Sequence, residues 1–213
     1  RMSVKKMKKT PRKVTLPRPG HADLAGVEKY GFDDIRNVLE RSSARETTMR
    51  VALASVCRKL LRDIGIHVAS RVVQIHDIVD SSSIPSNLKI QKLNQLADKS
   101  PVRCLNGNIE KEMIQVIDHA KSQGDSVGGV FEVIATGMPH GLGSYTQWNK
   151  KLQAKITSLM MSVNAYKAIE IGSGFNSGAK FGSEIHDEIE WNGKKYTRSS
   201  NNAGGIEGGM SNA

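Results

Sequence analysis

The chain has 213 residues and a formal net charge of +10, from 31 Lys and Arg against 21 Asp and Glu. This length can bury a core, and aliphatic side chains must supply most of it because only 5% of the residues are aromatic. No apolar run approaches the roughly 20 residues that span a bilayer, and no signal peptide is present, so a membrane protein is disfavoured. Cys57 and Cys104 stand far apart in sequence, which favours free thiols in a reducing, cytoplasmic compartment over a disulfide scaffold.

Most of the excess positive charge lies at the N-terminus. Residues 1–20 contain eight Lys or Arg and no acid, which leaves only about +2 for the remainder. Pro11, Pro17 and Pro19 disfavour helix there, so residues 1–20 are predicted to form a basic extended connector. A nucleic-acid-binding arm is the alternative, but no zinc-finger spacing, RNA-binding aromatic motif or interleaved aromatic residue supports it.

Residues 21–65 are predicted to form a first compact segment ending in a long helix. Ser43 and Glu46 have the spacing of a capping box, and Gly65 is a natural stop. The helix between them has apolar residues on more than one face, so it is predicted to be buried. These residues are Met49, Val51, Leu53, Ala54, Val56, Cys57, Leu60 and Leu61.

The middle of the chain alternates between β and α patterns. The β-branched run 68–79 predicts a strand, and a short helix near 88–96 is expected within a loop at 80–101. Asn108 is predicted to cap an amphipathic helix that ends at Gly124.

The second half of the chain continues this alternation. Residues 127–136 are predicted to form a strand in which Gly128-Gly129 marks a bulge or a close backbone approach. A helix is predicted over 148–163 and a short strand over 165–171. Residues 191–194, with Asn-Gly at their centre, predict a hairpin with a type I′ turn. Hairpins and glycine bends favour an α+β fold with antiparallel sheets over a doubly wound one.

The first candidate for chemistry is His21, which follows Pro19-Gly20 and precedes Asp23. An imidazole on a rigid turn, with a carboxylate near enough to orient or charge-stabilise it, is suited to general acid catalysis near neutral pH. The alternative is a structural histidine beside an aspartate.

The second candidate is the run Arg41-Ser42-Ser43-Ala44-Arg45. Two hydroxyls at a helix N-terminus, with free N–H groups and two guanidiniums, can bind phosphate or another anion. An ordinary helix cap with solvated arginines is the alternative.

The third candidate is a pair of glycine clusters at 172–175 and 204–209. Such glycines let the backbone approach a flat ring or a phosphate closely, although isolated clusters are often turns. Neither cluster matches a P-loop or a dinucleotide fingerprint. The histidines lack zinc-ligand spacing and no Gly-x-Ser-x-Gly elbow occurs, so no metal site and no serine hydrolase is predicted.

These signals occur in an order and spelling that resemble one family, chorismate synthase, from about Val14 to Asn212. The blocks that carry the resemblance are Arg18–Leu24, Lys29–Gly31, Asp34–Asn37, Arg41–Thr47, Asp125–Gly129, Gly141–Gly143, Asn164–Ala165, Glu170–Gly172, Gly174–Phe175, Gly182–Glu184, His186–Ile189 and Ala203–Gly209.

The resemblance implies a lyase that converts 5-enolpyruvylshikimate-3-phosphate to chorismate and phosphate by anti-1,4-elimination, with reduced FMN as cofactor. It also implies antiparallel sheets that enclose helices in a β-α-β sandwich, and a homotetramer. Residues 21–213 would then form the central part of a single domain. By the same resemblance His21 is a catalytic acid near the flavin, Arg45 faces the substrate, and the FMN-binding residues are Arg41, Ser42, Ser43, Asn164, Ala165 and Gly208.

Members of the family also carry segments before and after the region of resemblance, with a second catalytic histidine and a flavin-phosphate loop. We therefore expect the 213 residues alone to show no meaningful turnover and weak flavin affinity. Two further hypotheses remain open from the sequence: a non-catalytic oligomerisation core and a basic nucleic-acid-binding module.

Overall fold

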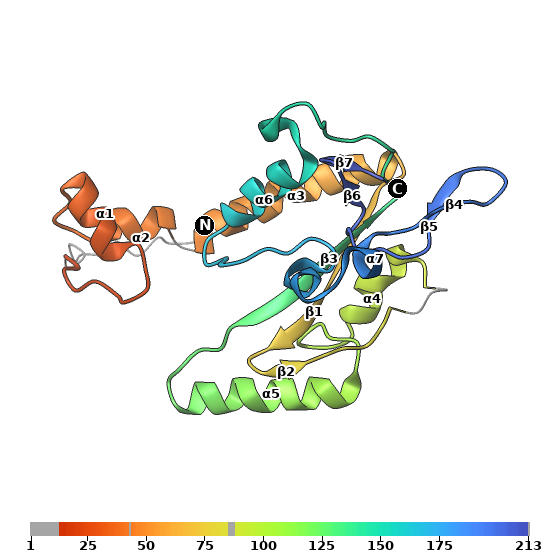
Figure 1. Ribbon diagram of the computed structural model, residues 1–213. Helices are drawn as coiled ribbons and strands as arrows, with labels where there is room; N and C mark the ends of the chain where they lie inside the picture. The colour runs from red at the N-terminus through yellow and green to blue at the C-terminus, as the bar shows by residue number, and fades with distance from the viewer. Residues whose placement is uncertain (1–12, 43, 85–87, 213) are drawn as a thin grey trace, which may run out of the picture. The chain divides into compact units, whose positions relative to one another are not determined.

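The computed structural model of the chain describes residues 13–42, 44–84 and 88–212. The chain divides into two compact units: Arg1–Ser55 with Ser158–Ile169, and Val56–Thr157 with Glu170–Ala213. The class is α+β with antiparallel strand pairs, as predicted (Figure 1). In chain order, the elements are α1 (Asp23–Tyr30), α2 (Arg36–Ser42), α3 (Ala44–Asp63), β1 (His67–Ile75), β2 (Ile78–Val79), η1 (Ile90–Lys92), α4 (Leu93–Ala97), α5 (Gly107–Ser122), β3 (Gly129–Thr136), η2 (Trp148–Lys150), α6 (Leu152–Met161), η3 (Gly174–Ala179), α7 (Gly182–Ile185), β4 (Ile189–Trp191), β5 (Tyr196–Arg198), β6 (Ile206–Glu207) and β7 (Met210–Ser211).

In the first unit, α1 and α2 pack closely because Gly26 has no side chain. A Cβ atom on Gly26 would lie 2.6 Å from Cγ1 of Val38. Val38 and Ile35 are the buried apolar residues of this pair of helices. Gly31 ends α1 in the left-handed conformation, with φ 65°, and its N–H donates to the carbonyl of Val27.

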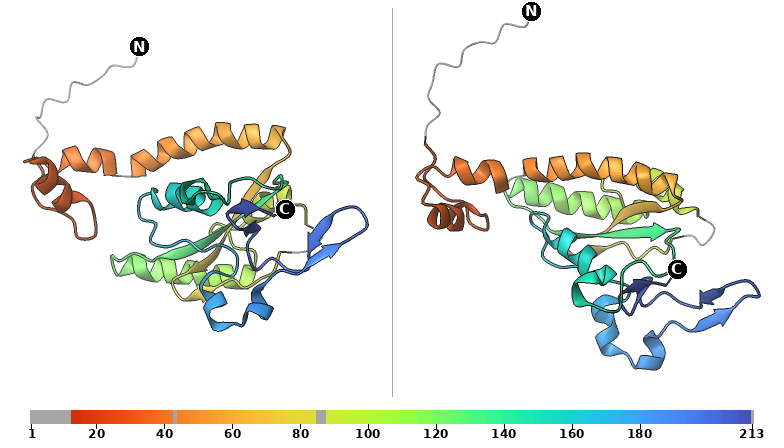
Figure 2. Two further views of the ribbon diagram at one scale, coloured as in Figure 1. Left: turned by 45° about the horizontal axis from the view of Figure 1, so that its top comes forward. Right: turned by 90° about the horizontal axis from the view of Figure 1, so that it is seen from above.

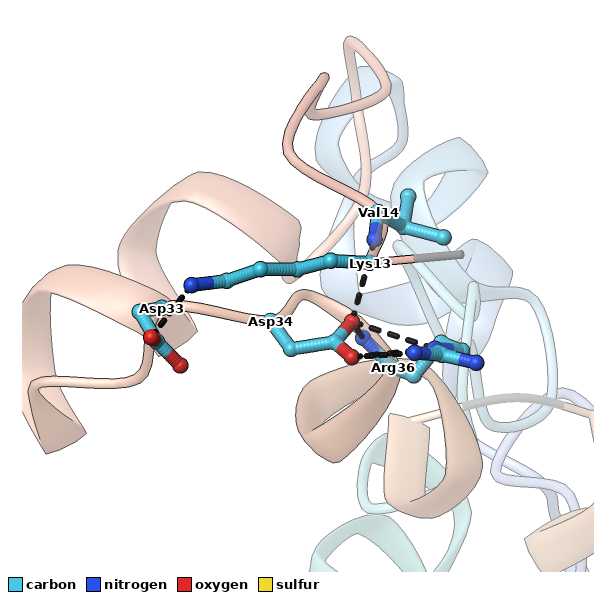
Figure 3. A network of polar contacts seen from close by, with 5 residues as sticks. All are labelled: Lys13, Val14, Asp33, Asp34 and Arg36. Carbon is cyan, nitrogen blue, oxygen red and sulfur yellow. Dashed lines mark hydrogen bonds and ion pairs between the residues drawn. The ribbon is translucent and has the colours of Figure 1, made fainter. Parts of the chain in front are cut away.

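The connection between α1 and α2 is tied to the basic segment before α1 (Figure 3). Lys13 pairs with Asp33, and the N–H of Val14 donates to Oδ1 of Asp34 at 3.3 Å. Arg36 donates from Nε to both carboxylate oxygens of Asp34, at 3.2 and 3.1 Å. The hydrogen bonds from Arg36 contribute most to lowering the pKa of Asp34, and the hydrogen bond from Val14 lowers it further. Part of the basic segment is thus held against acidic side chains of its own unit.

The second unit is built on a three-stranded antiparallel sheet in the order β2-β1-β3. The strand predicted at 68–79 is a hairpin, because His76 adopts φ 55° and turns the chain between β1 and β2. The pairing of β1 with β3 shifts register between Val72 and Gln74. A Cβ atom on Gly129 would lie 2.7 Å from the carbonyl oxygen of Gln74, so the predicted close backbone approach is present.

The core of this unit lies where η1 and α4 cover the sheet. Leu93 is fully buried and packs with Ile90 against Ala69 of β1. The longer helix α5 runs beside β2 and buries Met113 (Figures 1 and 2). Its N-cap is Asn106, not Asn108 as predicted, because the side chain of Asn106 accepts hydrogen bonds from the N–H groups of residues 108 and 109.

A buried carboxylate organises the long loop after β2. Asp80 is 2% exposed and accepts hydrogen bonds from the N–H groups of Leu105 (2.7 Å), Ser82 (3.0 Å) and Asn106 (3.3 Å). Burial raises the pKa of Asp80, but these hydrogen bonds outweigh burial and hold the pKa below its ordinary value. The loop is therefore fixed at both ends by one ionised side chain.

The limits of α3 agree with the predicted start near residue 44 and the stop at Gly65, which adopts φ 86°. The prediction that α3 is buried is wrong for this chain. Residues 51–60 are all exposed, with Leu53 at 69% and Val56 at 68%. The buried face of the β1–β3 sheet is filled by η1 and α4 instead, so α3 supplies no residue to the buried core.

Two short hairpins, β4–β5 and β6–β7, form the last part of the second unit. The β4–β5 hairpin projects from the unit (Figures 1 and 2). Four residues, 192–195, connect its strands, and Asn192 accepts hydrogen bonds from the N–H groups of Lys194 and Lys195. The predicted type I′ turn on Asn192-Gly193 does not form, because Gly193 adopts a positive φ, of 89°, but Asn192 does not. The strand predicted at 165–171 does not form, because Ala165 adopts φ 71°, outside the β region.

No helix in the described ranges combines the length and the hydropathy that a membrane crossing requires.

Candidate functional site

In the first unit, two segments named for the FMN site by resemblance are in direct contact. The side-chain Nδ2 of Asn164 donates to the carbonyl oxygen of Ser42 at 3.3 Å, across 122 residues of sequence. Arg41 and Ser42 form the last turn of α2 and directly precede α3, so they lie where one helix ends and the next begins. Ser42 donates its own hydroxyl to the carbonyl of Val38 at 2.9 Å, which leaves the oxygen lone pairs available to a ligand donor.

Ser43 lies outside the described residues. Arg45 belongs to the first turn of α3, where helical N–H groups have no intrahelical partner and the helix dipole favours an anion.

A second contact holds the two segments together. Arg50 on α3 donates from Nη1 to the hydroxyl of Ser162 at 2.7 Å and from Nε to Glu46 at 2.7 Å. Ser162 immediately follows α6 and stands two residues before Asn164. Glu46, predicted to belong to a capping box, thus forms an i,i+4 ion pair within α3. The position of Asn164 is therefore fixed from two sides.

Ala165 has an uncommon backbone conformation for a residue with a side chain. Its φ of 71° lies in the left-handed region, which costs a non-glycine residue of order 1 kcal/mol or more. Such conformations persist where surrounding contacts enforce them, and they concentrate at binding and catalytic sites. The two contacts just described supply that enforcement next to Ala165.

His21 lies on an exposed turn at the start of α1. Gly20 adopts φ 71°, and Nδ1 of His21 lies 3.0 Å from the carbonyl oxygen of Pro19. A carbonyl oxygen can only accept, so Nδ1 carries the proton and Nε2 faces away from this bond. Nε2 is then the ring nitrogen that this hydrogen bond leaves unoccupied.

Asp23 is not the hydrogen-bond partner of His21. Its buried carboxylate accepts from the backbone N–H of Arg18 at 3.0 Å, from Nε at 2.9 Å and from Nη2 at 3.2 Å. The side-chain and backbone hydrogen bonds of Arg18 lower the pKa of Asp23, and the charge of His21 lowers it further. Asp23 therefore fixes the start of the turn through Arg18, while the carbonyl of Pro19 orients the ring of His21.

In the second unit, the two glycine clusters approach each other. A Cβ atom on Gly172 would overlap the carbonyl oxygen of Asn202, and one on Gly204 would overlap the backbone of Gly172. The predicted close approach is therefore made between two backbone segments. Gly208 differs: it is exposed, adopts φ 58°, and has no atom within 4 Å of a built Cβ. It leaves an open surface at the tip of the β6–β7 hairpin.

Polar side chains that the sequence did not indicate surround this hairpin. Arg198 donates to Glu207 from Nε at 3.0 Å and from Nη2 at 2.8 Å. Asp187 accepts from the hydroxyl of Ser200 and from two backbone N–H groups of the loop before β6. Asp187 and Glu207 both fall within resemblance blocks without an assigned role, and no spacing signal in the sequence pairs Glu207 with Arg198.

The described residues contain groups suited to a phosphorylated, planar cofactor. The exposed Arg41, the junction of α2 with α3, and the open backbone at Gly208 are the kinds of group that contact a phosphate and a flat ring. Gly208 belongs to the second unit and the other described site residues to the first. Across residues 13–42, 44–84 and 88–212, no group of three His, Cys, Asp or Glu residues is arranged to hold a metal ion.

Comparison with known proteins gives a consistent result. A family model described as chorismate synthase matches residues 3–213. "Chorismate synthase 2" of Bacillus cereus (strain ATCC 10987 / NRS 248) is 52% identical over 210 residues, which cover 98% of this chain and 53% of that protein. "Chorismate synthase 1" of Bacillus anthracis is 51% identical over the same shares. A solved structure titled "Crystal Structure of Chorismate Synthase" matches with TM-score 0.83 and 44% identity, over 89% of this chain and 59% of that chain. The chain thus spans about half the length of the curated relatives it matches.

Proposed function

The chain belongs to the chorismate synthase family, and we propose that it supplies part of the active site of a lyase that forms chorismate from 5-enolpyruvylshikimate-3-phosphate. The proposed cofactor is reduced FMN, which would lend electron density to the substrate during loss of phosphate and take it back. The observation that carries this proposal is the hydrogen bond from Asn164 to Ser42. It joins two of the segments assigned to flavin binding.

The proposed role of the first unit is to hold anionic groups. Arg41 would contribute positive charge, Ser42 and Ser43 would contribute hydroxyls, and Asn164-Ala165 would present backbone groups. The first turn of α3 adds N–H groups, and Arg45 lies within that turn. Because a departing phosphate gains negative charge, preorganised positive groups and N–H donors stabilise the transition state more than the ground state.

The proposed role of His21 is to hold or deliver a proton at Nε2. The Pro19 carbonyl keeps the Nδ1 proton in place, so the ring keeps one orientation while Nε2 exchanges protons. The exposure of His21 leaves Nε2 within reach of a ligand.

A homotetramer and a cytoplasmic location are also proposed for the protein. Large aromatic residues of the second unit support association, since Phe175 is 81% exposed and Phe181 is 80% exposed. Among the described residues of the basic segment, Lys13 and Arg18 are paired with Asp33 and Asp23, which supports the lyase over a nucleic-acid-binding arm.

The test is an anaerobic assay of chorismate and phosphate production from 5-enolpyruvylshikimate-3-phosphate with chemically reduced FMN. Two proteins are compared: the 213-residue chain, and a chimera in which this chain replaces the matching half of the Bacillus cereus relative. We expect no turnover from the chain and turnover from the chimera. A folded, flavin-binding chimera without turnover would count against the proposed reaction.

A further inference from the structure

The β6–β7 hairpin that presents Gly208 is too short to hold its own shape. Each strand has two residues, and the turn between them is Gly208-Gly209, with φ 58° and 95°. Two glycines in the turn maximise backbone freedom, and an isolated two-stranded hairpin is marginal in water. The conformation of Gly208 must therefore be imposed by neighbouring groups.

One side of the hairpin is fixed by backbone and hydroxyl contacts. The N–H of Gly141 donates to the carbonyl of Ser211 at 2.9 Å, and the N–H of Ser211 donates to Leu142 at 3.0 Å. The N–H of Leu152 donates to the carbonyl of Gly209 at 2.8 Å. These contacts hold β7 and the second residue of the turn directly, and they reach β6, which leads into Gly208, only through its pairing with β7.

The other side is fixed by an ion pair. Arg198 on β5 donates two parallel hydrogen bonds to Glu207, the residue directly before Gly208. The side chain of Arg198 is only 18% exposed. Asn212 adds a third donor to Glu207, at 2.7 Å from its Oε1. Bidentate pairs of this kind fix direction as well as distance, so they define the course of the chain entering the turn.

Asp187 fixes the loop that joins β5 to β6. It accepts from the hydroxyl of Ser200 at 2.6 Å and from the N–H groups of Asn202 at 2.7 Å and Ala203 at 2.9 Å. The positive charge of Arg198 also acts on Asp187, so the two anchors belong to one network. Both ends of the segment from Ser200 to Glu207 are thereby held by ionised side chains.

We propose that Glu207, with Arg198 and Asp187, is a positioning residue that holds Gly208 in the conformation to which the flavin binds. The inference rests on the proposed function, because it takes Gly208 as part of the FMN site. None of the three side chains needs to touch the cofactor. They hold the turn in one conformation before the flavin binds. Binding then does not have to offset the free-energy cost of ordering the turn, and the affinity for FMN is not weakened by it.

The experiment compares Glu207→Gln with a matched control, Glu132→Gln, in the chimera described under the proposed function. Glu132 accepts from Nε of Arg71 at 2.8 Å in the β1–β3 sheet, so the control also removes the charge from an Arg–Glu pair of the second unit. The measurements are FMN affinity by fluorescence titration, hydrogen exchange of residues 204–212, and Tm. We expect Glu207→Gln to weaken FMN binding by about tenfold and to speed exchange at the turn. The control should lower Tm without either effect.

Three outcomes would overturn the inference. Unchanged exchange at the turn in Glu207→Gln would show that the ion pair does not hold Gly208. Faster exchange with unchanged FMN affinity would show that the turn does not need to be held for binding. Absence of FMN binding by the wild-type chimera would remove the proposed flavin site itself, which separates that failure from the other two.

Discussion

His21 and Pro19 are joined by a hydrogen bond of 3.0 Å between Nδ1 of the imidazole and the carbonyl oxygen two residues earlier. The bond assigns the tautomer, because only Nδ1 can donate within it. It also shows what the Pro-Gly turn contributes: the turn directs a carbonyl at the ring and leaves Nε2 exposed to a ligand.

The first prediction concerns this nitrogen. In the chimera, His21→Ala should lower the rate of chorismate formation by about 100- to 10,000-fold, the usual contribution of general acid–base catalysis. Tm should change little, because the side chain is exposed. His21→Asn is the sharper control, since its side-chain NH₂ can still donate to Pro19 while the atom corresponding to Nε2 is lost. An Asn variant with near-normal turnover would contradict the role of Nε2.

The second prediction concerns pH and the Arg18–Asp23 pair. Hydrogen bonds from Arg18 lower the folded-state pKa of Asp23, so the pair stabilises the fold above the unfolded value of about 3.9. That stabilisation is lost as pH falls through the lowered pKa. Asp23→Asn should therefore lower Tm at pH 7, and the difference from wild type should close as pH falls below about 4.

The control for this pair is Asp63→Asn. Asp63 forms an exposed i,i+4 pair with Lys59 at 3.5 Å, and such surface pairs contribute little to stability. We expect no measurable change in Tm at either pH. A difference between Asp23→Asn and wild type that stayed constant from pH 7 to pH 2 would show that the carboxylate charge of Asp23 does not stabilise the fold.

The third prediction concerns α3. Six large apolar residues between 49 and 64 are more than 60% exposed, so the 213-residue chain should self-associate. Leu53→Lys should shift sedimentation towards the monomer and reduce binding of an apolar dye. Gln115→Lys, an equal change of charge on the exposed side of α5, should do neither. A monomeric wild-type chain at tens of micromolar would contradict this prediction.

Local sequence signals predicted the long helices α3 and α5, the helical region of α6 and the class of the fold, but not α1 and α2. The stop of α3 at Gly65 follows from glycine chemistry, which acts within a few residues. The start at Ala44 agrees with the predicted position, and Ser43, the predicted cap, lies outside the described residues. The β1–β2 hairpin was missed because its turn uses His76 at positive φ, where the pattern would require Gly or Asn. The burial of α3 was predicted from composition alone, which does not say what covers a helix.

The contacts within the candidate site could not be predicted from local sequence patterns. Nothing in the spacing of Ser42 and Asn164 indicates that they meet, because their contact joins segments 122 residues apart. The resemblance to the chorismate synthase family assigned both residues to the FMN site, and the structure shows the hydrogen bond between them. Nor does the spacing of Arg18 and Asp23 indicate that they form three hydrogen bonds, whereas the position of Asp23 beside His21 suggested the imidazole as its neighbour.

The fourth prediction concerns backbone strain at Ala165. Ala165→Gly removes the steric cost of φ 71° and should raise the free energy of unfolding by roughly 0.5–1 kcal/mol, measured by urea titration. Ala168→Gly is the matched control three residues later, where no positive φ occurs; there the added freedom of the unfolded chain should lower stability. Opposite signs for the two variants are expected. A loss of stability in both would show that Ala165 is not strained.

The last prediction concerns the contact between the two glycine clusters. Gly172→Ala should destabilise the chain by roughly 2–4 kcal/mol, because its Cβ would overlap the carbonyl of Asn202 at a position that also has φ 61°. Gly178→Ala is the control, since a Cβ there meets nothing within 4 Å and no positive φ is required. Because Gly172 contacts the loop held by Asp187, hydrogen exchange at residues 199–205 should also increase in Gly172→Ala. Equal stability of the two variants would mean that the clusters separate at little cost, so that they could not fix the loop leading to Gly208.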